Sequence, residues 1–178
     1  MVRLVKEISP KQREWRNDPR IMAWTRGSEL LSEEDQQLWL KGLIGDPTRK
    51  FFGIEVSESS KIKGMIKRPT NVGTCGLTSI NVIHGSAEWS LLVGPEYQGK
   101  KYASAALKLL INYGLYSMRL NRIWGEIFDG NAASLHLAEK MGFKVEGKLR
   151  QTYYKNGKFI DSTIVGLLRE EWKPSQLS

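Results

Sequence analysis

Cysteine and histidine are scarce in this sequence. The 178 residues include one cysteine, Cys75, and two histidines, His84 and His136. A single cysteine cannot form an intrachain disulfide or build a cysteine-cluster metal site. The histidines fall in an expected turn and an expected helix, and neither is placed to activate a cysteine nucleophile. We therefore expect Cys75 to be a buried, inert thiol, and we expect no metal site.

Long apolar runs are also missing. No segment approaches the ~20 apolar residues that a membrane-spanning helix needs. Residues Met1–Pro10 alternate charged with apolar side chains and lack the apolar centre of a signal peptide. The composition, with 40% hydrophobic and 26% charged residues, is typical of a soluble globular protein. We expect a cytoplasmic protein without a membrane partner, forming a single domain over residues 1–178.

Clustered positive charge is absent as well, although the net charge is +8. The 27 lysines and arginines are spread along the chain without a long basic block. A nucleic-acid surface would require basic and aromatic side chains gathered together, and the six tryptophans and six tyrosines are dispersed. We expect no specific nucleic acid partner. The charge is compatible with a basic surface or with an anionic small ligand.

Hydrophobic periodicity predicts strands and helices in mixed order, without repeats. The predicted strands are Val2–Ile8, Phe51–Val56, Val72–Ile80, Ala87–Val93, Arg122–Phe128, one starting at Phe143–Glu146, and the hairpin strands Leu149–Lys155 and Lys158–Leu168 around Asn156-Gly157. Predicted helices cover Pro10–Asn17, the residues after the N-cap Ser32 (with Leu38, Trp39 and Leu43 buried), Ala103–Met118 and Ala132–Met141. The polar stretch Glu58–Lys67 is expected to be a turn or loop. Short connections favour a largely antiparallel sheet.

One stretch, Glu88–Met118, organises the rest. It is predicted to be a buried strand, a tight basic loop over Gly94–Lys101, and an amphipathic helix. A loop that feeds a helix presents unpaired backbone N–H groups and the positive end of the helix dipole at one point. Such a point suits a phosphate or pyrophosphate. Local physics therefore predicts an anion site at this loop.

Several motifs, taken in order, resemble the GNAT superfamily of N-acetyltransferases. Val93–Ala103 resembles its acyl-coenzyme A pyrophosphate loop, and Asn131–Ser134 followed by Ala138–Phe143 resembles its second signature. Trp15–Pro19 and Tyr153–Lys158 resemble the branch that acetylates ribosomal-protein N-termini, polyamines and nucleotide-linked amino sugars. The resemblance spans nearly the whole chain. It implies an α/β (α+β) fold, a mostly antiparallel mixed sheet of about seven strands with splayed central strands and about four helices.

The resemblance also implies how acetyl-CoA, the expected co-substrate, is held. The amides of Gly99 to Ser104 would cradle the pyrophosphate, and the backbone of Leu92–Gly94 would pair with the pantetheine arm. Asn131 would bind the arm from the far side. The implied cofactor-binding residues are Leu92, Val93, Gly94, Gln98, Gly99, Lys100, Lys101, Tyr102, Ala103, Ser104 and Asn131. Lys101 departs from the pattern, because glycine is usual there; a positive φ would cost it about 1 kcal/mol or more.

Amide formation requires a group that takes the amine proton, a polarised thioester and a group that protonates the thiolate. Glu88 is the candidate base, with an exposed strand-end acid as its alternative interpretation. The backbone N–H of Val93 is the candidate oxyanion donor. Many members of the family use a tyrosine as the acid, but its position is Ala138 here. Ser134 is the candidate substitute, with Tyr102 or water as alternatives.

The acceptor site is expected near the N-terminal helices and the C-terminal hairpin. Trp15, Arg16 and Tyr153 are the candidate contacts, although Trp15 and Tyr153 would alternatively be packing residues. The expected reaction is direct acetyl transfer from acetyl-CoA to a primary amine, on a ribosomal-protein or peptide N-terminus, an amino sugar or a polyamine. A CoA-binding module without catalysis is the alternative function. Edge strands near the hairpin are compatible with a homodimer.

Overall fold

A computed structural model of the chain describes residues 1–27, 29–57 and 68–173, so the predicted loop Glu58–Lys67 lies outside the described residues. The seven strands are β1 (Val2–Val5), β2 (Lys50–Val56), β3 (Thr70–Asn81), β4 (Ser86–Val93), β5 (Arg122–Phe128), β6 (Lys144–Lys155) and β7 (Lys158–Leu168). The α-helices are α1 (Lys11–Arg16), α2 (Pro19–Met22), α3 (Glu33–Gly42), α4 (Tyr102–Asn112) and α5 (Ala132–Lys140). The single-turn helix α2 is the one that the sequence did not predict.

The strands form one sheet in the order β1-β2-β3-β4-β5-β7-β6. Every neighbouring pair is antiparallel except β4 and β5, which run parallel. This arrangement confirms the predicted mostly antiparallel α+β fold. The hairpin prediction is also confirmed, because Asn156 and Gly157 both adopt positive φ between β6 and β7.

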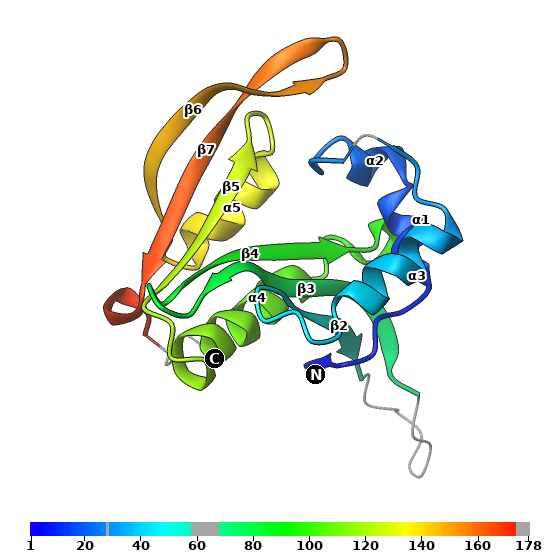
Figure 1. Cartoon of the computed structure of the whole chain (residues 1–178), viewed down its shortest axis with the longest axis horizontal. Helices are drawn as coiled ribbons and strands as arrows, with labels where there is room; N and C mark the ends of the chain where they lie inside the picture. The colour runs from blue at the N-terminus through cyan, green and yellow to red at the C-terminus, as the bar shows by residue number, and fades with distance from the viewer. Residues whose placement is uncertain (28, 58–67, 174–178) are drawn as a thin grey trace.

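The two central strands part soon after they pair. The register between β4 and β5 ends at Glu88 opposite Trp124, and Figure 1 shows the strands diverging from there. The indole of Trp89 lies across Gly125, where a Cβ would come within 2.2 Å of the indole Nε1. A bulky ring packed over a residue without a side chain thus marks the point of divergence. The predicted splay of the central strands is confirmed.

The core lies between α4 and the central strands. Ala106, Leu107, Leu110 and Ile111 of α4 are fully buried against the sheet, on the helix face that the periodicity predicted. Figure 1 shows α1, α2 and α3 grouped together across from the long β6–β7 hairpin. The splayed ends of β4 and β5 lie between these two groups, and the candidate functional site lies at these ends.

Helix α3 begins as predicted but buries a different face. The Ser32 side chain accepts the N–H of Asp35 at 3.1 Å, which confirms the N-cap. The prediction that Leu38 is buried was wrong, because it is 66% exposed. Gln36 is buried instead, and its amide donates to the Gln12 side chain at 2.7 Å. A polar residue occupies the inward position because another helix supplies its hydrogen-bond partner.

Candidate functional site

The chain turns sharply between β4 and α4. A short 3-10 turn over Pro95–Tyr97 leads into two residues with positive φ, Gly99 at +74° and Lys101 at +63°. A Cβ on Gly99 would meet nothing within 4 Å, so the space beside its backbone is open. Lys101 takes the left-handed conformation as the N-cap of α4. It therefore has the positive φ that the sequence analysis considered for this position, where glycine is usual.

The N-terminus of α4 has no side-chain cap among the described residues, whereas Ser32 caps α3 and Asn131 caps α5. The first intrahelical bond runs from the Ala105 N–H to the Lys101 carbonyl at 3.1 Å. The preceding N–H groups of the helix therefore have no acceptor within it. Together with the helix dipole, these groups form an anion-binding point beside the open backbone of Gly99.

The edge of β4 that faces the splay carries free backbone groups. The Gly94 N–H donates to the Val72 carbonyl at 2.9 Å, which makes Val93 a non-hydrogen-bonded partner of Gly73. Because bonded and non-bonded pairs alternate, the N–H and C=O of Val93 and Leu91 point away from β3. Those of Leu92 pair with β3, so within the predicted segment Leu92–Gly94 the backbone groups free on this edge belong to Val93. The Gln98 side chain donates to the Val93 carbonyl at 3.3 Å, which leaves the Val93 N–H facing the gap.

A groove of about 420 Å³ joins the loop to this strand edge; we call it the loop groove. It brings together most of the predicted cofactor-binding residues: Leu92, Val93, Gln98, Gly99, Lys101, Tyr102, Ala103 and Asn131. The other three lie beside it. Lys100 is exposed, with its ammonium 5.6 Å from the Tyr97 ring centre, and Ser104 lies in the first turn of α4. A Cβ on Gly94 would lie 2.6 Å from the Trp15 ring, so this glycine permits close packing.

The loop groove opens into a second space of about 310 Å³, which we call the carboxylate cavity. Both are lined by residues of α1, the segment after α2, β4 and α5: Arg16, Trp24, Thr25, Ser90, Leu91, Asn131 and Ser134. The side-chain Oδ1 of Asn131 accepts the Ser134 N–H at 3.2 Å, so the side-chain nitrogen Nδ2 remains as a donor. The two spaces form one cleft with Asn131 and Ser134 at the junction.

Glu88 lies in the carboxylate cavity and is 6% exposed, so the alternative of an exposed strand-end acid was wrong. Arg26 binds it with two hydrogen bonds, one of them from Nη1 to Oε2 at 3.1 Å. Thr78 donates to the same carboxylate at 3.3 Å. Arg26 also reaches Glu126 of β5, with 3.0 Å between Nη2 and Oε2. The hydrogen bonds to Glu88 raise the pKa of Arg26, so the guanidinium stays charged between two carboxylates.

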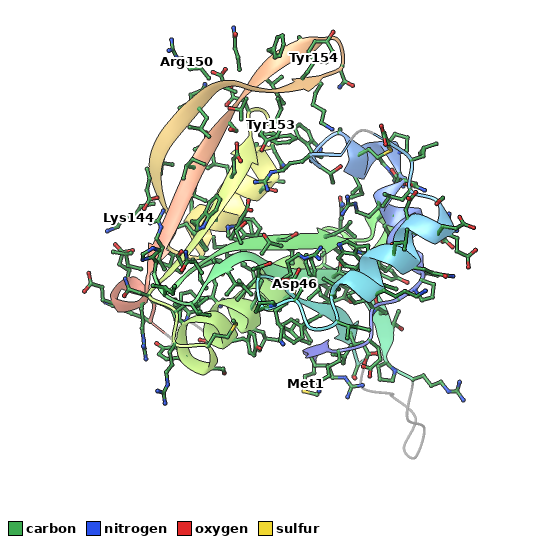
Figure 2. All side chains as sticks on the ribbon, viewed as in Figure 1. Met1, Asp46, Lys144, Arg150, Tyr153 and Tyr154 are labelled. Atoms are coloured by element: carbon green, nitrogen blue, oxygen red, sulfur yellow. The ribbon has the colours of Figure 1, made fainter. Side chains whose placement is uncertain are left out.

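Tyr153 joins this network through Glu126. Its hydroxyl donates to Glu126 Oε2 at 2.9 Å, and the Ser162 hydroxyl donates to Oε1 at 2.6 Å. Its ring packs on Phe128 with 4.5 Å between centroids. Figure 2 shows Tyr153 beside the end of β5 and Tyr154 further out on the hairpin. Burial, followed by the bond to Glu126, raises the pKa of Tyr153, so its hydroxyl stays protonated at neutral pH.

The two acceptor-site candidates from α1, Trp15 and Arg16, lie in different surroundings. Arg16 lines both parts of the cleft. Trp15 is 4% exposed, packs under Gly94 and donates its indole N–H to Glu96 at 3.1 Å. Trp15 therefore supports the loop from inside, which matches its alternative interpretation as a packing residue.

Sequence reasoning missed Arg26 and Glu126. Glu126 had a weak signal, because it is the only charged residue after Arg122 in the predicted strand Arg122–Phe128. Arg26 had none, since it follows α2 in an irregular segment and meets Glu88 across 62 positions of sequence. Both depend on chain crossings that local patterns do not encode.

The residue at position 138 carries no acidic side chain. Ala138 is 0% exposed, and alanine offers no proton to a leaving thiolate. The described residues contain no group of three His, Cys, Asp or Glu side chains that could hold a metal ion. In the same part of the chain, no helix has both the length and the apolar character needed to cross a membrane.

Comparison with known proteins identifies the family. A family model described as an acetyltransferase (GNAT) domain matches residues 6–144. The chain therefore belongs to the GNAT acetyltransferase family.

Relatives of known sequence carry several names. The chain is 36% identical over 100 residues to spermidine N(1)-acetyltransferase of Escherichia coli K12, covering 56% of this chain and 54% of the relative. It is 34% identical over 121 residues to the uncharacterized N-acetyltransferase p20 of Bacillus licheniformis, covering 68% and 63%. The chain thus spans less than two thirds of the length of these relatives.

A solved structure shows the same fold over nearly the whole chain. The crystal structure of spermidine N-acetyltransferase from Vibrio cholerae in complex with CoA and spermine superposes with a TM-score of 0.84, covering 96% of each chain at 23% identity. The similarity at this identity concerns the fold.

Proposed function

We propose that this chain transfers the acetyl group of acetyl-CoA directly to a primary amine. The observation that carries the proposal is the continuous cleft. Its loop groove offers an uncapped helix N-terminus and the free edge of β4. Its carboxylate cavity holds the buried Glu88. An anion-binding point and an acid–base group thus lie along one path, as transfer from a phosphate-bearing donor requires.

The loop groove fits the donor. The free N–H groups at the start of α4 would bind the pyrophosphate, and the open space beside Gly99 lets it approach the backbone. Val93 and Asn131 would hold the pantetheine arm from opposite sides. Acetyl-CoA supplies the reactive thioester, and the Val93 N–H would polarise its carbonyl oxygen.

The bond changes balance without a covalent enzyme intermediate. The amine nitrogen forms a bond to the acetyl carbon, the carbon–sulfur bond breaks, and the electron pair of that bond leaves on the CoA sulfur. One proton passes from the amine to Glu88, directly or through water. One proton must reach the sulfur, and Ser134 is the proposed donor because it lies at the junction and Ala138 has no proton to give. Ser134 would regain its proton from Glu88 through water, which returns both groups to their starting state.

Arg26 affects the proton transfer from the amine to Glu88. A carboxylate held by a guanidinium is a weak base, because its lone pairs are engaged. The incoming amine would therefore have to share or displace the contact between Arg26 and Glu88, which leaves Glu126 to retain Arg26. Glu88 would then be free to accept the proton.

The test compares Glu88→Gln with Glu126→Gln in steady-state assays of CoA release. Glu88→Gln is expected to lower kcat by about 10²- to 10⁴-fold, the usual contribution of a general base. The KM for acetyl-CoA should change less than about twofold, since the loop groove is untouched. Glu126→Gln is the matched control, because it also removes a carboxylate from Arg26 but leaves the proposed base. Unchanged turnover in Glu88→Gln, or equal losses in both variants, would refute the assignment.

A CoA-binding module without catalysis is the second candidate. It is favoured by Ala138 at the expected position of the acid and by the engagement of Glu88 with Arg26. Calorimetry with CoA and a thiol-release assay over peptide, amino-sugar and polyamine acceptors distinguish the two. Binding without thiol release on any amine would support the module.

We also propose that the chain pairs with a second copy through β6. This strand ends the sheet, and its Val145 and Leu149 are 59% and 43% exposed. Light scattering coupled to size-exclusion chromatography should report a dimer that Leu149→Glu weakens. A monomer at all concentrations would exclude this pairing.

A further inference from the structure

Arg16, the last residue of α1, is a cation within the cleft that has no ion-pair partner among the described residues. It lines the carboxylate cavity, the loop groove and two further spaces beside them. It forms no hydrogen bond or ion pair with any residue in the described ranges 1–27, 29–57 and 68–173. Burial lowers the pKa of Arg16, as expected for a cation withdrawn from water without a counter-charge.

The acids around Arg16 do not neutralise it. Asp18 pairs with Arg20 at 2.7 Å. Asp35 accepts the Ser32 N–H at 2.8 Å as part of the α3 cap. Glu29 lines one of the two further spaces with Arg16 without forming an ion pair to it. A guanidinium in this situation is best satisfied by an anion that a ligand brings, and its planar fork matches a carboxylate or a phosphate.

A second cation lies close to the same point. Lys155, at the end of β6, is 8% exposed and donates to the Gly27 carbonyl at 2.9 Å. A Cβ on Gly27 would be 3.9 Å from Arg16 Nη2, so both side chains reach this residue. An ammonium has three donors, and the described contacts occupy one of them. The corner of the cleft near Gly27 is therefore positive.

The charge of the carboxylate cavity points to the same kind of ligand. Four charged side chains line it, Arg16 and Arg26 against Glu88 and Glu126. Arg26 already bridges both glutamates. A polycation would therefore enter a cavity of zero formal charge in a protein of net charge +8. A molecule with one amine and one anionic group would find a partner for each.

We propose that the acceptor carries one anionic group, a carboxylate or a phosphate, which Arg16 binds while the amine lies at Glu88. This inference rests on the proposed acetyl transfer and specifies its substrate class. Arg16 then decides specificity, and Lys155 strengthens the positive corner.

The first experiment uses the wild-type chain with acetyl-CoA and matched acceptors. Glucosamine 6-phosphate against glucosamine tests a phosphate, and the peptide amide Ser-Glu-Ala-Ala against Ser-Gln-Ala-Ala tests a carboxylate. Spermidine is the polycation. We expect kcat/KM for the anionic member to exceed that of its neutral partner about tenfold or more in one of the two pairs, and to exceed that of spermidine.

The second experiment repeats the pairs with Arg16→Met, Arg16→Lys and Glu29→Gln. Arg16→Met should reduce the preference for the anionic acceptor to within about twofold, while the KM for acetyl-CoA changes less than twofold. Arg16→Lys should restore part of the preference, because it keeps the charge but loses the fork. Glu29→Gln should leave the preference unchanged, since Glu29 does not pair with Arg16.

Three outcomes would overturn the inference: a wild-type preference for neutral acceptors or spermidine, an equal loss on all acceptors in Arg16→Met, or a loss confined to acetyl-CoA. If no amine is acetylated, the proposed function fails. The anion site is then decided by calorimetry in the presence of CoA. Glucosamine 6-phosphate should bind about tenfold more tightly than glucosamine, and Arg16→Met should abolish the difference; equal binding would refute the site.

Discussion

Lys101 offers the sharpest test of how the loop is built. It holds φ at +63° directly before α4, a conformation that costs an L-residue with a side chain about 1–2 kcal/mol. Glycine avoids this cost but loses about 0.5–1 kcal/mol through its freer unfolded chain. Lys101→Gly should therefore stabilise the protein by about 0–1.5 kcal/mol. In a chain of this size that corresponds to a rise of up to about 6 °C in Tm.

Lys101→Ala is the matched control, because alanine removes the ammonium and retains the backbone cost. Its Tm should stay within about 1 °C of wild type. Thermal melts of the three proteins in one buffer, without ligand, measure the effect. Calorimetric titration with CoA then examines the loop. We expect Lys101→Gly to bind CoA at least as tightly as wild type, because its N–H groups adopt the same arrangement without strain.

Two results would refute this reasoning. A fall in Tm for Lys101→Gly would show that the left-handed residue is not strained at this position. A loss of CoA affinity in both variants that shrinks as salt is added would show that the ammonium contacts phosphate directly.

Two further predictions concern the sheet. Gly125→Ala should lower the free energy of unfolding in urea by about 1–3 kcal/mol, because its Cβ would lie 2.2 Å from the Trp89 indole nitrogen. Gly147→Ala is the control: a Cβ there meets nothing within 4 Å, so the free energy of unfolding should change by less than about 0.5 kcal/mol, and equal losses in the two variants would contradict the contact. Cys75 should resist a thiol reagent at pH 8 until the protein unfolds, because burial raises its pKa to about 12; fast labelling of the native protein would contradict this.

Local sequence patterns were sufficient to predict most of the helices and strands and the tight loop before α4. The N-cap at Ser32 and the Asn156-Gly157 turn each act within a few residues. They can therefore be recognised without knowing the fold. The apolar face of α4 was readable for the same reason, since its period follows from helix geometry alone.

The sequence pattern did not predict which face of α3 is buried. Its pattern contains Leu38 as well as Gln36, and hydrophobicity favours burying the leucine. The outcome depends on Gln12 of α1, which satisfies the Gln36 amide inside the protein. Only the packing of two helices makes that partner available.

The sequence by itself determined the loop end of the cleft, because a tight loop before a helix leaves its own backbone N–H groups unpaired at that point. Tertiary structure decided the other end. Glu88, Arg26 and Glu126 come from β4, the segment after α2, and β5, and they meet only because the sheet and the N-terminal helices fold over one another. The energy of such ion pairs depends on distance and burial. Neither quantity is encoded in local spacing.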